Sequence, residues 1–345
     1  MMESQQAHRK DEHLSLATAS YQRAHAHHYF DQVRLIHDAL PETAVAAVDP
    51  TVQLADGLQL EWPFYLEAMT GGSKQATKVN RALAKLAHKH HLAMATGSLS
   101  VALKEAAAQP SFTVVREANP DGIVIANLGA DASLDKARAA VDLLAADALE
   151  LHLNAAQELV MPEGDRQFYW LDNITRLVDG LDVPVIVKEV GFGMSRRTIE
   201  RLQTAGVQLI NVSGRGGTNF AMIENRRNHQ LDMADLADWG QTTPESLLEA
   251  RDSQATIIAS GGVTCPLDVV KAGVLGARAV GVAGYFLNIL VRDGASALDQ
   301  VLTDWQAQLP RLLTLVGAQH FIDLSRVDYV LTGPLYEYAQ QRGLV

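Results

Sequence analysis

From Trp62 onward the chain repeats one pattern, in which an apolar, β-branched run ending in Gly, Ser, Thr or Asn is followed by an Ala- and Leu-rich stretch. The apolar runs are typical of buried strands, and the stretches between them are typical of helices. Strands that alternate with helices pair in parallel through right-handed crossovers. The predicted strands are PFYLEAM, HLAMAT, GIVIANL, ALELHLN, VPVIVKEV, GVQLINVS, ATIIAS and RAVGVA.

Eight such strands predict a closed (β/α)8 barrel, the TIM barrel of the α/β class, with a site at the carboxyl ends of its strands. A doubly wound sheet is the alternative, but no GxGxxG follows the first strand and the number of strands favours closure. We assign residues 61–345 to the barrel with its C-terminal helices, and residues 1–60 to an N-terminal arm and extension. Residues 298–345 are expected to form helices with a turn at TGP, for barrel closure or subunit contact. The predicted helices include residues 74–88, 133–146, 166–178, 195–204 and 266–272.

The connection after the sixth strand runs from Ser213 to Ala255, which is too long for a single crossover helix. Connections of this length in compact domains are usually functional or disordered. Because Gly214, Gly216 and Gly217 lie at its root, we predict a lid over the mouth of the barrel.

Composition narrows the classes of partner. A chain of 345 residues that is 48% hydrophobic can bury a large core, and its net charge of -11 argues against nucleic acid or an anionic membrane as the main partner. Cys265 is the single cysteine, so no intrachain disulfide can form. The polar N-terminus does not resemble a secretory signal, and no apolar stretch reaches the roughly 20 residues of a membrane span. We therefore expect a soluble, cytoplasmic protein.

The most informative stretch is ALELHLNAAQE, from Ala148 to Glu158. A strand places side chains i and i+2 on the same face, so His152 and Asn154 are expected to point the same way at the end of the strand. Gln157 and Glu158 follow on the loop or on the first helical turn. The alternative is a strand end that is merely capped by polar residues in contact with water.

Lys188 ends PVIVK, an otherwise apolar strand, and faces either the pocket or solvent. A buried ammonium needs a partner, so a pocket position implies an anionic or electron-rich group such as a reduced flavin. The alternative is a surface lysine whose stem lies on apolar groups. The glycines of SGGV and VAGY, after the seventh and eighth strands, are either plain turn glycines or a barrel phosphate site formed by backbone N–H groups.

HRKDEH, near the N-terminus, is either a solvated leader or an arm whose Arg9 and Lys10 close over an anionic ligand. An adjacent guanidinium and ammonium suit a diphosphate. The histidines that follow lack the spacing of a zinc site, so we interpret them as surface or helix-packing residues: His25, His27, His28 and His37.

In chain order, HRKDEH, AMTGG, TGSLS, ANLGA, HLNAAQE, VKEVGFGMS, NVSGRGGTN, SGGV and VAG resemble the type 2 isopentenyl-diphosphate delta-isomerases, from about residue 8 to at least residue 290. HLNAAQE and the RK-containing arm are specific to this resemblance, whereas the glycine motifs are shared with many FMN barrels. The resemblance implies the interconversion of isopentenyl and dimethylallyl diphosphate in isoprenoid synthesis, with Mg2+ and without net redox change. It also implies that FMN is kept reduced by NADPH or another reductant and serves as acid or base, and that the protein is a homotetramer or larger.

The same resemblance implies roles for individual residues. Arg9, Lys10, Ser98 and Gln157 would bind the substrate, and Glu158 would hold the Mg2+ that bridges its diphosphate. His152, Asn154, Gln157 and Lys188 would form the catalytic pocket, with Gln157 orienting the reacting end. The residues implied to contact FMN are Ala68, Met69, Thr70, Ser98, Asn127, Lys188, Ser213, Thr218, Gly261, Gly262, Val263, Ala283 and Gly284.

Two positions depart from the family pattern. Ser100 stands where many members have an arginine near the diphosphate, and Asn211 stands where an aspartate is expected beneath the flavin. The rival enzyme class is the FMN-dependent 2-hydroxy-acid oxidases or dehydrogenases, which need a His–Arg pair at the late strand ends. The stretches after the sixth and seventh strands, SGRGGTN and SGGV, contain no histidine, which argues against this enzyme class. A barrel that only stores flavin would not need the polar group in HLNAAQE.

Overall fold

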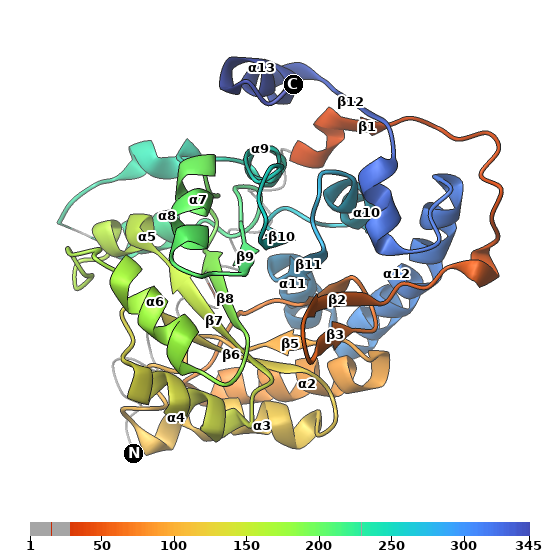
Figure 1. The fold of residues 1–345 in the computed structure, drawn as a ribbon. Helices are drawn as coiled ribbons and strands as arrows, with labels where there is room; N and C mark the ends of the chain where they lie inside the picture. Colours follow the sequence, from red (N-terminus) through yellow and green to blue (C-terminus); the bar gives the residue numbers. More distant parts are fainter. Residues whose placement is uncertain (1–14, 16–27, 229) are drawn as a thin grey trace.

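The computed structural model describes residue 15 and residues 28–228 and 230–345, and its core is a closed barrel of eight parallel strands (Figure 1). The prediction of a (β/α)8 barrel is confirmed, and each of the eight predicted strands is present. Arg9, Lys10, His25 and His27 lie outside the described residues. The barrel strands, in the order in which they lie side by side, are β10 (Thr256–Ser260), β11 (Ala279–Val282), β4 (Phe64–Leu66), β5 (Met94–Ala95), β6 (Val124–Gly129), β7 (Ala148–Leu153), β8 (Val185–Glu189) and β9 (Leu209–Asn211).

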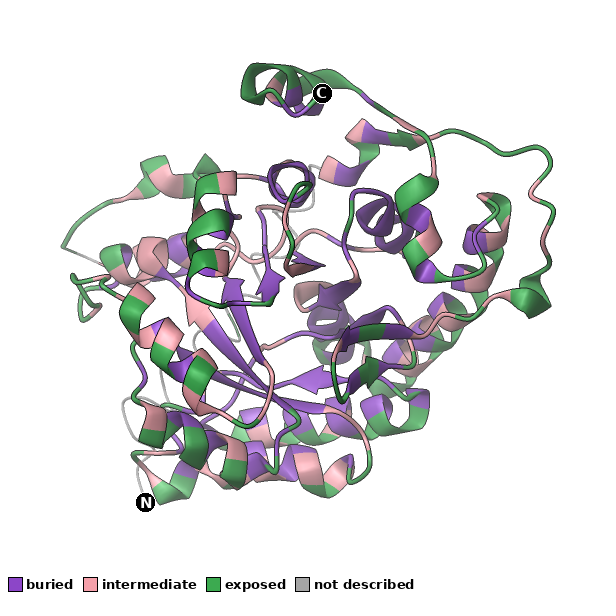
Figure 2. Ribbon diagram, in the orientation of Figure 1, coloured by how far each residue is buried: buried purple, intermediate pink, exposed green. Residues whose placement is uncertain are grey.

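Helices surround the barrel, with buried residues on the faces toward the barrel and exposed residues on the outer faces (Figure 2). Three of them begin at a serine, Ser73, Ser133 or Ser195, whose hydroxyl accepts a hydrogen bond from a backbone N–H of the first turn. The helices between consecutive strands include α2 (Lys74–His90), α3 (Pro110–Ala118), α4 (Leu134–Leu144), α5 (Ala155–Val160), α6 (Leu171–Gly180), α7 (Arg196–Thr204) and α10 (Pro266–Val274). The helices after β11 are α11 (Gly284–Asp293), α12 (Ala295–Leu315) and α13 (Gly333–Arg342).

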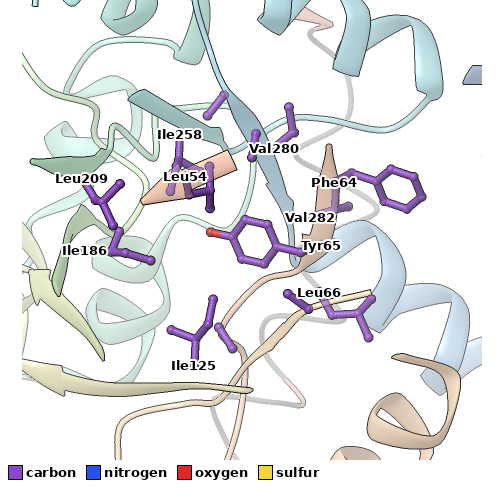
Figure 3. Close-up of a cluster of buried hydrophobic side chains, with 14 of the residues drawn as sticks. Leu54, Phe64, Tyr65, Leu66, Ile125, Ile186, Leu209, Ile258, Val280 and Val282 are labelled. Carbon is purple, nitrogen blue, oxygen red and sulfur yellow. The ribbon is translucent and has the colours of Figure 1, made fainter. Parts of the chain in front are cut away.

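The interior of the barrel is filled by side chains, as a barrel of this size requires. Tyr65 of β4 points into the centre, among Ile186, Leu209 and Ile258 (Figure 3). Leu54 reaches the same cluster from a hairpin of β2 (Val52–Ala55) and β3 (Leu58–Leu60). Part of the predicted N-terminal extension is therefore built into the core of the barrel.

Three local predictions need correction. The helix expected over residues 166–178 begins only at Leu171. The C-terminal region contains a strand, β12 (Tyr329–Leu331), that pairs with β1 (Val33–Leu35), because it offers an edge to the N-terminal extension. TGP is the start of α13 rather than a turn between helices, with Pro334 in its first turn, where a missing N–H costs nothing.

The long connection after β9 contains regular structure instead of an irregular loop: α8 (Phe220–Arg227), η4 (Ala234–Asp238) and α9 (Thr243–Glu249). The root of this connection lines the mouth of the barrel, as expected of a lid. The other short helices are η1 (Tyr29–Gln32), η2 (Val45–Ala47), η3 (Ala106–Ala108) and η5 (Phe321–Arg326). Among the described residues, we find no helix with the length and apolar character needed to cross a bilayer.

Candidate active site

A cavity of about 350 Å³ opens at the carboxyl ends of the barrel strands. This volume lies in the range of small-molecule and cofactor sites. It brings together every described residue to which we assigned a substrate, cofactor, catalytic or metal role. Those residues are Ala68, Met69, Thr70, Ser98, Asn127, His152, Asn154, Gln157, Glu158, Lys188, Ser213, Thr218, Gly261, Gly262, Val263, Ala283 and Gly284.

The strand register explains why the polar side chains meet. His152 of β7 is paired with Lys188 of β8, and Lys188 is paired with Asn211 of β9. One level deeper, Asn127 of β6 is paired with Glu150 of β7. Because paired residues of parallel strands project on the same side, these groups form a polar layer at the floor of the cavity.

The polar end of β7 forms one hydrogen-bonded group. Asn154 Nδ2 donates to Glu158 Oε1 at 2.7 Å, and the backbone N–H of Asp165 donates to Glu158 Oε2 at 2.7 Å. Gln157 Nε2 donates to Glu224 Oε1 of α8 at 3.3 Å. The lid connection thus contacts Gln157, the residue that we expect to orient the reacting end of the substrate.

Lys188 is buried and faces the pocket, as the pocket alternative required. Its partners within the protein are carboxylates that we did not identify from the sequence. Lys188 Nζ lies 3.1 Å from Glu67 Oε1 and 3.9 Å from Glu150 Oε2. Both glutamates interrupt otherwise apolar strand sequences, and this interruption could have identified them from the sequence as buried functional groups. These carboxyl groups of the barrel therefore balance the positive charge of the Lys188 ammonium, and no bound anion is needed for that purpose.

The two glutamates have opposite electrostatic surroundings. Burial opposes ionisation of Glu67, but Lys188 and the backbone N–H of Ala68 hold its pKa below the usual value. Burial and the neighbouring charge of Glu67 raise the pKa of Glu150 to about 8. One ionised and one protonated carboxyl group together with Lys188 make the cluster neutral at pH 7.

Asn211 belongs to this cluster and does not line the cavity. Its Nδ2 donates to Glu67 Oε2 at 2.6 Å, and its Oδ1 accepts from the Ser260 hydroxyl at 2.8 Å. Asn211 thus takes part in the hydrogen-bond network of Glu67 and Tyr65 as a neutral side chain. Ser213, two residues on, has a φ of 35°, which a non-glycine residue adopts only where the surroundings impose it.

The glycines after β10 and β11 fit a phosphate group. Gly261 and Gly262 have φ values of 95° and 76°, and a Cβ on Gly261 would overlap the carbonyl oxygen of Gly214. Ala283 and Gly284, at the start of α11, complete this wall of the cavity. Backbone N–H groups at a helix start bind phosphate without basic side chains. The cradle suits the FMN phosphate.

The lining also contains groups that we did not predict, Lys104 and Asp131 among them. Lys104 and Lys188 are the only lysines of the described lining, and this lining contains no arginine. No group of three or more potential metal ligands forms in the part of the chain that the structure describes. A metal held at Glu158 would therefore take most of its ligands from substrate and water.

Tyr29 packs beside Gly216, a residue of the cavity lining. The guanidinium carbon of Arg215 is 5.3 Å from the centre of its ring, and Lys271 Nζ donates to the Phe30 carbonyl at 2.8 Å. The start of the continuous described chain therefore lies beside the glycine loop that contains Gly216.

Comparison with known proteins decides the family. A family model described as FMN-dependent dehydrogenase matches residues 145–330. A protein of Limosilactobacillus reuteri subsp. reuteri (strain JCM 1112), named isopentenyl-diphosphate delta-isomerase, is 67% identical over 347 residues, covering 100% of both chains. The chain belongs to the FMN-dependent, type 2 isopentenyl-diphosphate delta-isomerases. A delta-isomerase of Latilactobacillus sakei subsp. sakei (strain 23K) is 48% identical over 99% of this chain and 98% of its own.

Solved structures support the barrel assignment of this isomerase. Mandelate oxidase with (S)-2-phenylpropionate superimposes with a TM-score of 0.63 at 18% identity, covering 93% of this chain and 90% of that one. A Pediococcus acidilactici protein described as a putative lactate oxidase gives a TM-score of 0.66 at 17% identity, with coverages of 91% and 87%. At such low identity these similarities concern the fold alone.

Proposed function

We propose that this isomerase interconverts isopentenyl diphosphate and dimethylallyl diphosphate with reduced FMN and Mg2+ and without net redox change. The observation that carries the proposal is the convergence of the HLNAAQE side chains, Lys188 and the glycine cradle in one cavity, in a chain 67% identical to a named delta-isomerase. Membership of the FMN-dependent family supports the cofactor.

FMN, when bound and reduced, supplies an electron-rich ring that stabilises positive charge near an alkene and a nitrogen that exchanges a proton. Gly261, Gly262 and Gly284 would hold its phosphate through backbone N–H groups. Lys188 would place its ammonium against the flavin ring, since it is buried at the cavity wall with its charge fixed by Glu67. NADPH or another reductant would keep the flavin reduced.

The chain's own side chains would position the diphosphate. Glu158 would hold Mg2+ through a carboxylate already oriented by Asn154 and Asp165. Arg9 and Lys10, from the N-terminal arm, would add positive charge, and Ser98 a hydroxyl donor. We propose that the protein acts in the cytoplasm as a homotetramer or larger assembly.

The reacting end of the substrate would face Gln157, whose amide is oriented by Glu224. His152 and Asn154 would line the same wall and exclude water from the alkene. Oxidation of a 2-hydroxy acid is the competing activity, because the solved neighbours include mandelate oxidase. An oxidase of that kind needs an arginine to bind the substrate carboxylate, and the described cavity lining contains none.

An anaerobic assay with FMN, Mg2+ and isopentenyl diphosphate, with and without dithionite, tests the proposal. We expect dimethylallyl diphosphate only after reduction, and no stoichiometric consumption of reductant. Tight FMN binding with no product, but with turnover of a 2-hydroxy acid, would overturn the isomerase assignment in favour of the oxidase.

A further inference from the structure

A continuous hydrogen-bonded chain joins the substrate side of the cavity to the flavin side beneath its floor. His152 Nδ1 lies 2.9 Å from Asn127 Oδ1, and Asn127 Nδ2 donates to Glu150 Oε2 at 3.0 Å. Glu150 Oε1 lies 3.4 Å from the hydroxyl of Tyr65, which donates to Glu67 Oε2 at 2.9 Å. Glu150 is fully buried, and it is not among the residues that line the cavity.

The direction of each hydrogen bond in this chain follows from the charges at its flavin end. Glu67 is the ionised carboxylate because Lys188 lies against it at 3.1 Å, so Glu67 accepts the Tyr65 hydroxyl hydrogen. Glu150 Oε1 faces the Tyr65 oxygen, and Glu150 is also hydrogen-bonded to the ionised Glu67, so the proton of Glu150 lies on this side. Glu150 Oε2, which carries no proton in this arrangement, accepts from Asn127.

The amide of Asn127 carries this direction to His152. With its NH2 group turned to Glu150, its carbonyl oxygen faces His152 Nδ1, so that nitrogen has to carry a hydrogen. In the neutral ring Nε2 is then an acceptor. Nε2 lies next to Gly129, a cavity-lining residue that is paired with His152 in the barrel and whose missing side chain leaves space for the ring and for the Asp131 carboxylate.

We propose that Glu150 is a positioning residue that orients the Asn127 amide and thereby keeps the proton of His152 on Nδ1, presenting Nε2 to the cavity as an acceptor. The inference rests on the proposed function, in which His152 lines the substrate pocket. The charged and titratable groups around Glu150 are Glu67 and Tyr65 of β4, Lys188 of β8 and His152 of its own strand. Of these, Glu150 alone contacts Asn127 from below the cavity floor.

The test is 15N NMR of histidine-labelled, FMN-loaded protein at about pH 8, where imidazole rings are neutral. The His152→Gln spectrum identifies the His152 signals among those of 12 histidines. In the wild-type protein we expect the Nδ1–H tautomer to dominate. Glu150→Met removes the acceptor of Asn127, and the ratio of Nδ1–H to Nε2–H tautomers should fall about fivefold or more. Glu150→Met keeps the Lys188–Glu67 pair, so the cluster stays balanced in charge.

Glu150→Gln is the conservative rescue, because its carbonyl can accept from Asn127 while its NH2 donates to Tyr65. It should retain the wild-type tautomer. Glu189→Gln is the matched control: Glu189 is a buried carboxylate on β8 whose Oε2 accepts hydrogen bonds from the backbone N–H groups of the next three residues. A wild-type tautomer in Glu150→Met, or the same change in Glu189→Gln, would overturn the proposal. If Glu150→Met does not fold, an Nε2–H tautomer in Glu150→Gln would overturn it equally. No substrate is needed, so the result is independent of the isomerase assay.

Discussion

Lys188 and Glu67 form a buried ion pair of 3.1 Å that joins β8 to β4 across the interior of the barrel. The exposed fractions of the two side chains are 7% and 3%. The pair keeps a full positive charge at the wall of the cofactor cavity without leaving it unbalanced. Removal of either partner would leave the charge of the other buried without a counter-ion and would destabilise the fold.

Lys188→Met should destabilise the fold by about 3–5 kcal/mol, because it leaves the Glu67 and Glu150 carboxyl groups buried without a cation. The double substitution Lys188→Met with Glu67→Gln should recover much of that loss. Chemical denaturation of all variants in the absence of FMN measures the coupling. If the effects of Lys188→Met and Glu67→Gln simply add in the double variant, the two side chains do not interact in solution.

The stability of the protein should depend on pH through Glu150. Burial raises the pKa of Glu150 from its ordinary value of 4.5 to about 8. Between these values the unfolded chain releases the proton that the folded protein keeps, so stability falls as pH rises through this window. Glu150→Gln should reduce that slope, leaving the part that comes from Glu189, whose pKa burial also raises to about 8. The gain over the wild-type protein should be larger at pH 8 than at pH 5. Parallel thermal denaturation series would show it, and an unchanged pH slope in Glu150→Gln would assign the titration elsewhere.

Gly261→Ala should weaken FMN binding by about tenfold or more, because a Cβ at φ 95° is strained and would overlap the Gly214 carbonyl in the phosphate cradle. Gly276→Ala is the matched control, since Gly276 has a φ of 101° but no atom within 4 Å of a built Cβ. Fluorescence titration with FMN compares the two. Equal affinities would remove the glycines from the phosphate site.

Glu158→Gln should abolish most activity and the dependence on Mg2+ while leaving FMN affinity unchanged. The amide of glutamine keeps one of the two hydrogen bonds that the Glu158 carboxylate accepts, and it is a much poorer Mg2+ ligand. Rates measured over a series of Mg2+ concentrations test this expectation. Full activity with an unaltered Mg2+ profile would exclude Glu158 as the metal ligand.

Arg9→Ala and Lys10→Ala should each raise KM for isopentenyl diphosphate by about tenfold, because each removes a charge-assisted contact to a phosphate oxygen. The effect should shrink at high salt, where the remaining attraction is screened. His13→Ala, in the same stretch, serves as a control. A KM unchanged in both cationic variants would separate the arm from the diphosphate.

The sequence by itself determined the barrel and its eight strands, and the family resemblance supplied many of the residues that line the cavity. Apolar periodicity and the glycine-ended strands were sufficient, because a closed parallel barrel places every strand's carboxyl end at one mouth. It also placed His152, Asn154, Gln157 and Glu158 together, since all lie at the end of β7 or on the first turn of α5.

Only the tertiary structure decided what lies beneath the cavity. Glu67 directly follows β4, and Glu150 and Asn211 belong to β7 and β9, so their contacts depend on the stagger of strands that are far apart in the sequence. The same is true of the pairing of β1 with β12 and of the helices in the lid connection. The local sequence pattern predicts which face of a strand a side chain occupies. The residue that it contacts across the barrel is set by barrel closure and strand register.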